Sequence, residues 1–404
     1  MQMCLSHPTD GYYMNQAHHV FGSKGDFITS PEISQVFGEL VAVWLLSQWA
    51  STAKDSAFRL VELGPGRGTL MDDILRVVLQ LANFGQKINV HLVETSPSMR
   101  ALQDAKLQKS ERKKVQFHWH NSISEIPTET NEYTMLVAHE FFDALPIHVL
   151  QKTAKGWNEV LIASNTEPES STSSENSEKP ETPVSAEPTF SFRRVLSPEP
   201  SAVSTVLGNS SPRFQALPEG SYLEVSPTVF RIGRKVGELL AVQTSEIGTQ
   251  TSPGGCGLIV DYGDNKAFGD SFRAFKEHKI VDVFHQPGNC DLTANVDFAY
   301  LKESMSDLVN CYGPVTQKTF LERMGIQLRL QSLLKTATTD ARREQILDGA
   351  KRLVDPLGMG KEYQVLAITN KLAKDAQVWP FVDMPSQDQP DGKQNENVST
   401  QNTQ

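Results

Sequence analysis

The stretch LVELGPGRGTLMDDIL, residues 60–75, constrains the fold more than any other part of the chain. An apolar strand leads into three glycines spaced two apart, Gly64, Gly66 and Gly68, and an amphipathic helix follows. Glycines at such a turn let the backbone approach a ligand closely. The ligands open at this point are a nucleoside triphosphate, a dinucleotide or another molecule that carries adenosine.

Strand and helix signals alternate along most of the chain. Strands are predicted over 58–63, 88–94, 114–120, 132–140, 255–264 and 361–370, and helices over 69–84 and 96–108. This alternation predicts an α/β fold with a parallel sheet, helices on both faces, and ligands at the carboxyl ends of the strands. Helix signals over 31–50 and between Asn295 and Leu353 predict additions to this core.

The spacing of the glycines does not by itself identify the ligand. No phosphate-binding GxxxxGK[ST] motif occurs, and Thr69 stands where a dinucleotide-binding turn has its last glycine. Glu62 is more informative, because a carboxylate about 4 Å from a diphosphate would oppose it by several kcal/mol. The ammonium and sulfonium of S-adenosylmethionine would be attracted instead, and Glu94 is suited to the ribose hydroxyls. The alternative is that both acids are strand-end charges in water.

Four motifs carry a family resemblance: DFITSPEIS (26–34), VELGPGRGTLMDDILR (61–76), HEFFDALPIHVL (139–150) and PGNCDLTANVDFAYL (287–301). They resemble the MidA-like methyltransferases, the DUF185 family, in the same order and over about residues 11–163 and 205–370. The resemblance implies a seven-stranded, Rossmann-like core that binds S-adenosylmethionine, with an added helical and β subdomain. The cofactor-binding residues of the glycine turn are then Glu62, Gly64, Pro65, Gly66, Gly68, Thr69 and Glu94.

The resemblance also implies an activity and a place in the cell. The mitochondrial member of this family is a type II-like protein arginine N-methyltransferase, which dimethylates a subunit of NADH:ubiquinone oxidoreductase (complex I) symmetrically during its assembly. A protein substrate and the mitochondrial matrix are therefore expected. Family members have a further N-terminal segment before the position of Gly11, and no transit peptide is visible here, so a truncated start is expected.

Two segments lack the apolar residues that a packed domain needs. Residues 164–188 hold six glutamates against one lysine, and the tail from about Ser386 is similarly polar. Such segments bury too little surface to offset the entropy lost on ordering, so both are expected to be disordered. The predicted divisions are an N-terminal helical and loop segment (1–55), the cofactor-binding core (56–163), a disordered insert (164–204), the rest of the core with a substrate-side subdomain (205–376) and a disordered tail (377–404).

The HEFFDALP motif follows the fourth predicted strand. Glu140 and Asp143 are three residues apart, so one helical turn would place both carboxylates on one face. A carboxylate pair can hold an arginine guanidinium, and one of the two can take its proton as the methyl group arrives. The alternative is that Glu140 caps a helix whose Phe141, Phe142 and Leu145 belong to the core. The resemblance favours the catalytic interpretation.

The GDFITSPEIS motif has a structural and a functional interpretation. Thr29 or Ser30 can cap a helix, with Glu32 near the positive end of its dipole, which accounts for the whole pattern. The resemblance implies in addition that these three residues lie near the cofactor.

The DLTANVDF motif is similarly open. Asp291, Thr293 and Asp297 are polar residues that could line an acceptor channel on the substrate side. They could equally form a turn and a helix cap.

Composition and spacing exclude several other classes of protein. A formal charge of −10 disfavours broad nucleic-acid binding, and the most apolar run, residues 40–50, is too short to span a bilayer. Four dispersed cysteines indicate a reducing compartment. His118 and His120 would share one face of a strand, and His18 and His19 are adjacent, but a third ligand is lacking and no metal is predicted.

Two other functions remain open. The first is a non-catalytic assembly factor with a methyltransferase fold, which acts by protein contact. The second is a nicotinamide-dependent oxidoreductase that uses the same glycine turn.

Overall fold

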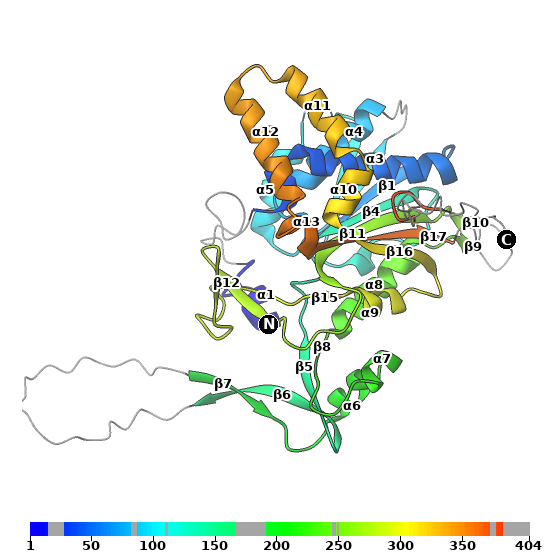
Figure 1. Cartoon of the computed structure of the whole chain (residues 1–404). Helices are drawn as coiled ribbons and strands as arrows, with labels where there is room; N and C mark the ends of the chain where they lie inside the picture. The colour runs from blue at the N-terminus through cyan, green and yellow to red at the C-terminus, as the bar shows by residue number, and fades with distance from the viewer. Residues whose placement is uncertain are drawn as a thin grey trace, which may run out of the picture.

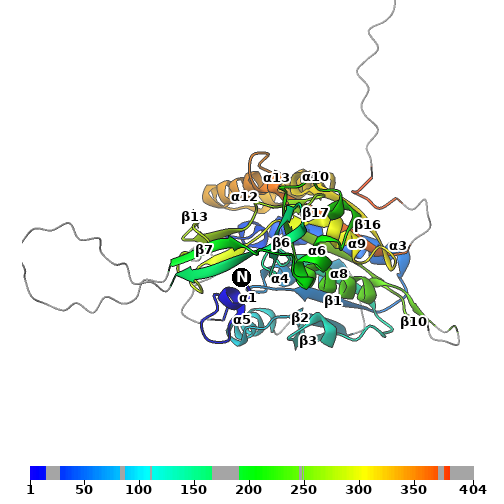
Figure 2. The same cartoon turned by 90° about the horizontal axis from the view of Figure 1, so that it is seen from below.

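A twisted central sheet organises the molecule. The computed structural model describes residues 1–14, 28–81, 87–109, 112–165, 191–244, 248, 250–371 and 377–382. Seven strands run in the order β16-β17-β11-β4-β1-β2-β3, and β15 (Val296–Asp297) pairs beside them with β11 (Figures 1 and 2). The seven strands are β1 (Phe58–Leu63), β2 (Ile88–Val93), β3 (Val115–His120), β4 (Tyr133–His139), β11 (Gly255–Asp264), β16 (Val309–Thr316) and β17 (Tyr363–Asn370).

The expected parallel sheet holds for five strands and fails at β17. β3, β2, β1, β4 and β11 are parallel neighbours, whereas β17 is antiparallel to both β11 and β16. The reason is where the chain enters the strand. Helix α13 (Met359–Glu362) delivers it beside Tyr262, at the carboxyl end of β11, so β17 has to run back across the sheet.

Helices cover both faces of this sheet, which explains why every residue of β1 is buried. Alternate side chains of β1 join separate cores. Leu60 packs with α3 (Gln35–Thr52) and α4 (Thr69–Leu81), on the face that also holds Leu107 of α5 (Pro97–Leu107). On the opposite face, Val61 packs with α8 (Pro227–Leu240), α9 (Phe298–Glu303) and the short 3-10 helix η2 (Ile123–Glu125).

The single helix predicted over 31–50 is divided in two. α2 (Ser30–Ile33) ends before Ser34, whose backbone is extended and whose side chain accepts a hydrogen bond from the amide of Val36 at the start of α3. A serine that caps the second helix therefore interrupts the first.

An antiparallel subdomain is inserted after β4, in the order β7-β6-β5-β8 (Figure 1). Its elements are β5 (His148–Thr153), β6 (Gly156–Asn165), β7 (Ser191–Leu196), α6 (Ala202–Gly208), α7 (Pro212–Gln215) and β8 (Tyr222–Val225). The expectation of disorder over 164–204 is wrong for residues 191–204. The alternating FRRVL sequence forms β7, and Ser201 and Ser204 form a capping box at the start of α6. Residues 166–190 lie outside the described part.

A second small sheet of order β13-β12-β14 lies beside the N-terminal helix α1 (Gln2–Ser6). Its strands are β12 (Arg273–Lys276), β13 (Lys279–Val281) and β14 (Asp291–Thr293). The short strands β9 (Gln243–Thr244) and β10 (Gln250–Ser252) form a separate pair. Leu5 and Tyr12 pack against Ala274 and Leu292, so the N-terminal residues are part of this layer.

A helical cap follows β16, and the tail expected to be disordered over 377–404 begins by packing against it. The cap contains α10 (Gln317–Arg323), α11 (Ile326–Thr336), α12 (Asp340–Leu353) and α13. Trp44 donates a hydrogen bond to the carbonyl of Trp379 (2.9 Å), and Arg323 donates to the carbonyl of Pro380 (2.7 Å). The apolar VWPFV sequence explains this order, and residues 383–404 lie outside the described part. None of the helices among the described residues is long and apolar enough to cross a membrane.

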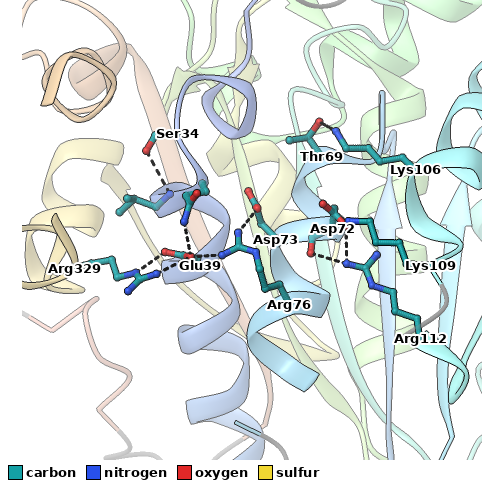
Figure 3. A network of polar contacts seen from close by, with 12 residues as sticks. Ser34, Glu39, Thr69, Asp72, Asp73, Arg76, Lys106, Lys109, Arg112 and Arg329 are labelled. Carbon is teal, nitrogen blue, oxygen red and sulfur yellow. Dashed lines mark hydrogen bonds and ion pairs between the residues drawn. The ribbon is translucent and has the colours of Figure 1, made fainter. Parts of the chain in front are cut away.

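Glu39 joins three helices (Figure 3). Its side chain on α3 accepts hydrogen bonds from Arg76 of α4 and from Arg329 of α11, the latter at 2.6 and 2.9 Å. Arg76 also donates to Asp73. Burial raises the pKa of Glu39, but the hydrogen bonds and positive charges of Arg329 and Arg76 outweigh it, so the pKa lies below its usual value. The contact between Glu39 and Arg329 therefore joins helix α11 of the cap to helix α3 of the core.

We expect Glu39→Gln to lower the free energy of unfolding by about 1–2 kcal/mol, because charge-assisted hydrogen bonds are lost while both arginines are partly exposed. The folded-state pKa is depressed, so this contribution is present at neutral pH and is lost as the pH falls through the acid range. Urea unfolding at pH 7 and at pH 4 measures both effects. The exposed Glu344→Gln is the control, and equal stabilities of the two variants at pH 7 would contradict the role of Glu39.

Candidate functional site

The glycine turn has the geometry that its sequence predicts. Gly64, Gly66 and Gly68 all have positive φ angles, of 65°, 50° and 75°. A Cβ atom on Gly64 would lie 2.8 Å from the ring of Phe141, so a side chain has no room there. The amide of Gly64 donates to the carbonyl of Val93 (3.1 Å), which fixes the turn to the end of β2. The turn then enters α4 at Thr69.

Glu62 faces a small cavity of about 50 Å³ below this turn. The cavity is lined by Thr29, Pro31, Glu32, Glu62, Gly64, Pro65, Gly66, Arg67, Thr69, Leu70, His139 and Glu140. Glu62 is only 2% exposed, and its Oε2 has no hydrogen-bond partner among the described residues. Burial raises the pKa of Glu62 to about 8, although the positive charge of Lys106 opposes the shift. A buried, unpartnered carboxylate oxygen fits a cationic ligand.

Glu94 lies just beyond the end of β2 and faces a larger cavity of about 760 Å³, which Gly64 and Gly66 also line. Its Oε1 accepts a hydrogen bond from the amide of Ser96 (2.8 Å), and its Oε2 accepts one from Gln103 (3.2 Å). Gln103 also donates to the carbonyl of Gly66 (2.7 Å) and therefore ties Glu94 to the glycine turn. The volume is that of a ligand pocket.

The helical turn expected for Glu140 and Asp143 is wrong. Glu140 has a φ angle of 50°, and the chain makes a non-helical turn after β4. Asp261, in the carboxyl-terminal half of β11, holds this turn: its Oδ2 accepts hydrogen bonds from the amides of Phe141, Phe142 and Asp143 at 3.1, 2.8 and 3.3 Å. Both Glu140 and Asp143 nevertheless line the larger cavity.

Carboxyl groups are concentrated at this cavity. Burial raises the pKa of Glu140 to about 8, against the hydrogen bond that the hydroxyl of Tyr363 donates to its Oε1 (2.7 Å). Burial and the nearby charges of Asp261 and Asp291 raise the pKa of Asp143 well above its usual value, and Arg273 opposes this only in part. Asp143 and Asp291 of this lining are buried, whereas Arg231, Lys235 and Arg352, which also line the cavity, are not.

Some of the remaining predicted residues line a cavity, and others make only structural contacts. Thr29 and Glu32 line the small cavity, whereas the hydroxyl of Ser30 is buried and donates to Gln317 (3.0 Å). The Thr29 side chain makes no capping hydrogen bond, although it stands at the N-cap of α2. Gly68 lines neither cavity and instead packs near Leu107.

On the substrate side, Asp291 and Thr293 line the larger cavity. Asp297 does not: its side chain accepts a hydrogen bond from the amide of Tyr300 (3.0 Å), which caps α9, and it pairs with Arg213 (3.0 Å). For Asp297 the helix-cap alternative is the one that the structure supports.

Several residues of the site escaped the sequence reasoning. Asp261 could have been found, because it follows the apolar run of a buried strand, as Glu62 and Glu94 do. No sequence pattern marks Tyr13 and Tyr363 as site residues, because each lies more than 200 positions from its partner. Tyr13 donates a hydrogen bond to Asp291, and Tyr363 donates one to Glu140.

The two histidines of β3 have hydrogen-bond partners on β2. His120 Nε2 lies 2.9 Å from His91 Nδ1, and His118 Nε2 lies 3.1 Å from Asn89 Oδ1. Trp119 donates to Gln103 (2.9 Å) from the other face of β3. Among the described residues no three potential ligands gather as a metal site would need. His18 and His19 lie outside those residues.

The sheet, the glycine turn and the two acid-lined cavities define the class of S-adenosylmethionine-dependent methyltransferases. The structure has a TM-score of 0.68 to a COG1565 superfamily protein from Burkholderia thailandensis, solved with S-adenosylhomocysteine bound; the two are 21% identical, and the match covers 91% of this chain and 86% of that one. A sequence model of the family described as "Putative S-adenosyl-L-methionine-dependent methyltransferase" matches residues 40–315. The chain belongs to this family, which confirms the predicted fold class and cofactor.

Curated relatives match nearly the whole chain. The zebrafish protein arginine methyltransferase NDUFAF7, mitochondrial, is 38% identical over 95% of this chain and 86% of its own length. The human protein of the same name is 35% identical over 91% of this chain and 78% of its own length. These names support a mitochondrial location, as the sequence resemblance implied.

The raised carboxyl pKa values predict how stability depends on pH. Glu62 and Glu140 have pKa values of about 8 in the folded protein, compared with a usual value of 4.5. Between about pH 5 and pH 8 the folded state keeps protons that the unfolded state has lost, so stability falls as the pH rises, by at most about 1.4 kcal/mol per pH unit for each group.

We expect Glu62→Gln to flatten this dependence, because the amide does not titrate. Thermal unfolding of the ligand-free protein from pH 5.5 to pH 8 tests it, with the exposed Glu219→Gln as control. A profile for Glu62→Gln that is as steep as that of the control would show that Glu62 is already ionised at pH 5.5.

Proposed function

We propose that the chain is a protein arginine N-methyltransferase that acts in the assembly of mitochondrial complex I, with symmetric dimethylation of a complex I subunit as the outcome. The observation that supports this most directly is the excess of buried carboxyl groups along one continuous lining. A methyl donor with a positive sulfur and an arginine acceptor are both cations, and together they would stabilise the ionised form of these carboxyl groups.

The cofactor side of the proposal rests on Glu62 and Glu94. Glu62 would hold the α-ammonium with its unpartnered Oε2, and Glu94 would accept hydrogen bonds from the ribose hydroxyls. Gly64 and Gly66 leave the backbone open to the ligand because they carry no side chain. Thr29, Glu32, Pro65 and Thr69 also line the small cavity, whereas Ser30 and Gly68 line neither cavity and would act only through their neighbours.

The fit of the cofactor has an energetic basis. A neutral ligand would leave Glu62 protonated at pH 7, because burial raises its pKa. An ammonium group favours the ionised form, so binding would release the proton of Glu62, and the ammonium would offset the cost of the buried carboxylate that forms.

The acceptor side of the proposal rests on Glu140 and Asp143. S-adenosylmethionine supplies a methyl group on a positively charged sulfur when it is bound. A guanidinium beside Glu140 favours the carboxylate form, which can orient the acceptor nitrogen and accept the proton that this nitrogen loses. Tyr363 donates to Glu140 and would hold it in place while it does so. Asp143 would supply the second carboxylate of the pair that holds the guanidinium.

The names of the relatives support the acceptor and the pathway. Both relatives are called protein arginine methyltransferases, and the family match leaves no ground for a nicotinamide-dependent oxidoreductase. A scaffold that binds the cofactor and acts by protein contact alone is the remaining alternative, and it is an outcome of the experiment below.

The test is transfer of labelled methyl groups from S-adenosylmethionine to purified complex I subunits. Wild-type protein should label an arginine, and Glu140→Gln should lower the rate by about 100-fold or more, because the proton acceptor is lost. Glu132→Gln, at the opposite end of β4, is the matched control and should keep the rate. Gly66→Val should abolish S-adenosylhomocysteine binding, measured by calorimetry.

Two results would contradict the proposal. If wild-type protein binds S-adenosylhomocysteine and supports assembly but labels nothing, the scaffold alternative is correct. If label appears on lysine or on a carboxylate, the acceptor is not arginine. Chromatography of the hydrolysed product separates symmetric from asymmetric dimethylarginine.

A further inference from the structure

The small cavity below the glycine turn has a second buried polar atom without a partner. Nε2 of His139, like Oε2 of Glu62, has no hydrogen-bond partner among the described residues, and both side chains line this cavity. His139 is the last residue of β4, and only 9% of it is exposed. A buried nitrogen of this kind costs free energy unless a ligand or a water molecule bonds it.

The register of the sheet places the two side chains on one face. Glu62 on β1 pairs with Val137 on the neighbouring strand β4 (Figure 1). His139 lies two residues beyond Val137, and side chains two residues apart on a strand point to the same face. Val137 and Leu60 both pack in the core that α3 and α4 cover, which identifies the face. Glu62 and His139 therefore face the small cavity from neighbouring strands.

Two aromatic rings fix the orientation of His139. Phe37 of α3 packs against it edge to face, with the ring centres 5.1 Å apart. Tyr363 stacks on it with an angle of 9° between the planes, and the ring centres are 5.9 Å apart. Tyr363 is itself held by the hydrogen bond that it donates to Glu140. Because the interior is closely packed, the ring cannot turn Nε2 away from the cavity without displacing these neighbours.

The chemistry of the ring suits a cationic donor. Burial lowers the pKa of His139 to about 3, so the imidazole is neutral and has one N–H group and one acceptor nitrogen. Nδ1 lies 3.6 Å from Oε1 of Glu140. With the ring proton on Nδ1, facing this carboxyl group, Nε2 is the acceptor that faces the small cavity. The cavity then contains two neighbouring acceptors, Nε2 of His139 and Oε2 of Glu62.

The cations near this cavity do not occupy Nε2 of His139. Arg67 lines the cavity, but its side chain is half-exposed and its Nη1 lies 3.6 Å from Oε1 of Glu32. Lys106 donates a hydrogen bond to Thr69 at 2.5 Å. Neither cation is a hydrogen-bond partner of His139, so among the described residues its acceptor nitrogen is open to a ligand.

We propose that Nε2 of His139 accepts a hydrogen bond from the α-ammonium of S-adenosylmethionine, so that His139 and Glu62 hold this group together. This inference rests on the assignment of Glu62 to the α-ammonium in the proposed function. An ammonium group has three N–H donors, so a single carboxylate oxygen leaves donors to be satisfied. A neutral second acceptor adds a hydrogen bond without adding negative charge to a lining that already contains Glu32 and Glu140.

A structural role is the competing interpretation, because a buried water molecule could satisfy Nε2 while the ring only fills space. Two substitutions distinguish these roles. His139→Phe keeps a ring for Phe37 and Tyr363 to pack against and removes both nitrogens. His139→Gln places an amide oxygen near the position of Nε2, where it can accept the same hydrogen bond. If His139→Phe does not fold, His139→Leu replaces it as the variant without an acceptor.

The experiment is calorimetry on the full chain with S-adenosylhomocysteine and with its analogue that lacks the α-amino group. We expect His139→Phe to weaken binding of S-adenosylhomocysteine by about tenfold or more, because a hydrogen bond to a charged group is lost. Its affinity for the analogue, and the affinity of His139→Gln for S-adenosylhomocysteine, should stay within about threefold of the wild-type values. His91→Phe is the matched control, because His91 is a buried histidine of β2 that bonds His120 and lines neither cavity.

The outcomes separate this inference from the proposed function, because binding needs no acceptor substrate. If His139→Phe weakens both ligands equally, or neither, the inference is wrong, and arginine methylation still decides the proposed function. If wild-type protein binds the two ligands with equal affinity, the α-ammonium is not held in this cavity, and the inference fails together with the assignment of Glu62. If the expected pattern appears in a protein that labels no arginine, the inference holds and the proposed function fails.

Discussion

The carboxylate of Asp261 fixes the geometry on which the rest of the site depends. One of its oxygens accepts hydrogen bonds from three successive backbone amides, those of Phe141, Phe142 and Asp143. These bonds join the end of β11 to the turn after β4, and they hold Glu140 in a left-handed conformation that costs a non-glycine residue free energy. The same turn places Phe141 against Gly64, so the acceptor side and the cofactor side share one anchor.

The fold contains two kinds of acidic side chain: those paired with cations, which stabilise it, and those without such partners, which can bind a cationic ligand. Glu39 faces Arg329 and Arg76, and Asp72 faces Lys109 and Arg112. The pKa values of both acids lie below the usual range because these partners outweigh burial. Glu62 and Glu140 are buried without such partners, and their pKa values rise to about 8. In the absence of a cation these groups lower their cost by holding protons. The ligand-free protein is thus least strained when its pocket is neutral.

Sequence reasoning succeeded where the structure is set by neighbours in the chain. The approximate strand boundaries, the glycine turn and the place of Glu62 before it are local, since a strand, a turn and a helix follow one another over residues 58–81. It failed where distant segments decide. Asp261, rather than a helical repeat, sets the turn at Glu140. The hydroxyl of Ser30 donates a hydrogen bond to Gln317 and does not line the cavity. Composition also placed the end of the insert too late, because β7 owes its order to pairing with β6.

The contrast between Glu39 and Glu62 explains why sequence alone could not separate support from function. Both are acids among apolar residues of helix or strand, and both are buried. What distinguishes them is a cation brought by another element. Arg329 reaches Glu39 from α11, almost 300 positions later. Lys106, whose charge acts on Glu62, instead donates a hydrogen bond to Thr69 at 2.5 Å. Of the two buried acids, the one assigned to ligand binding is Glu62, which has no ion-pair partner among the described residues. An acid becomes a candidate ligand-binding group when tertiary structure buries it and leaves its charge to be matched from outside.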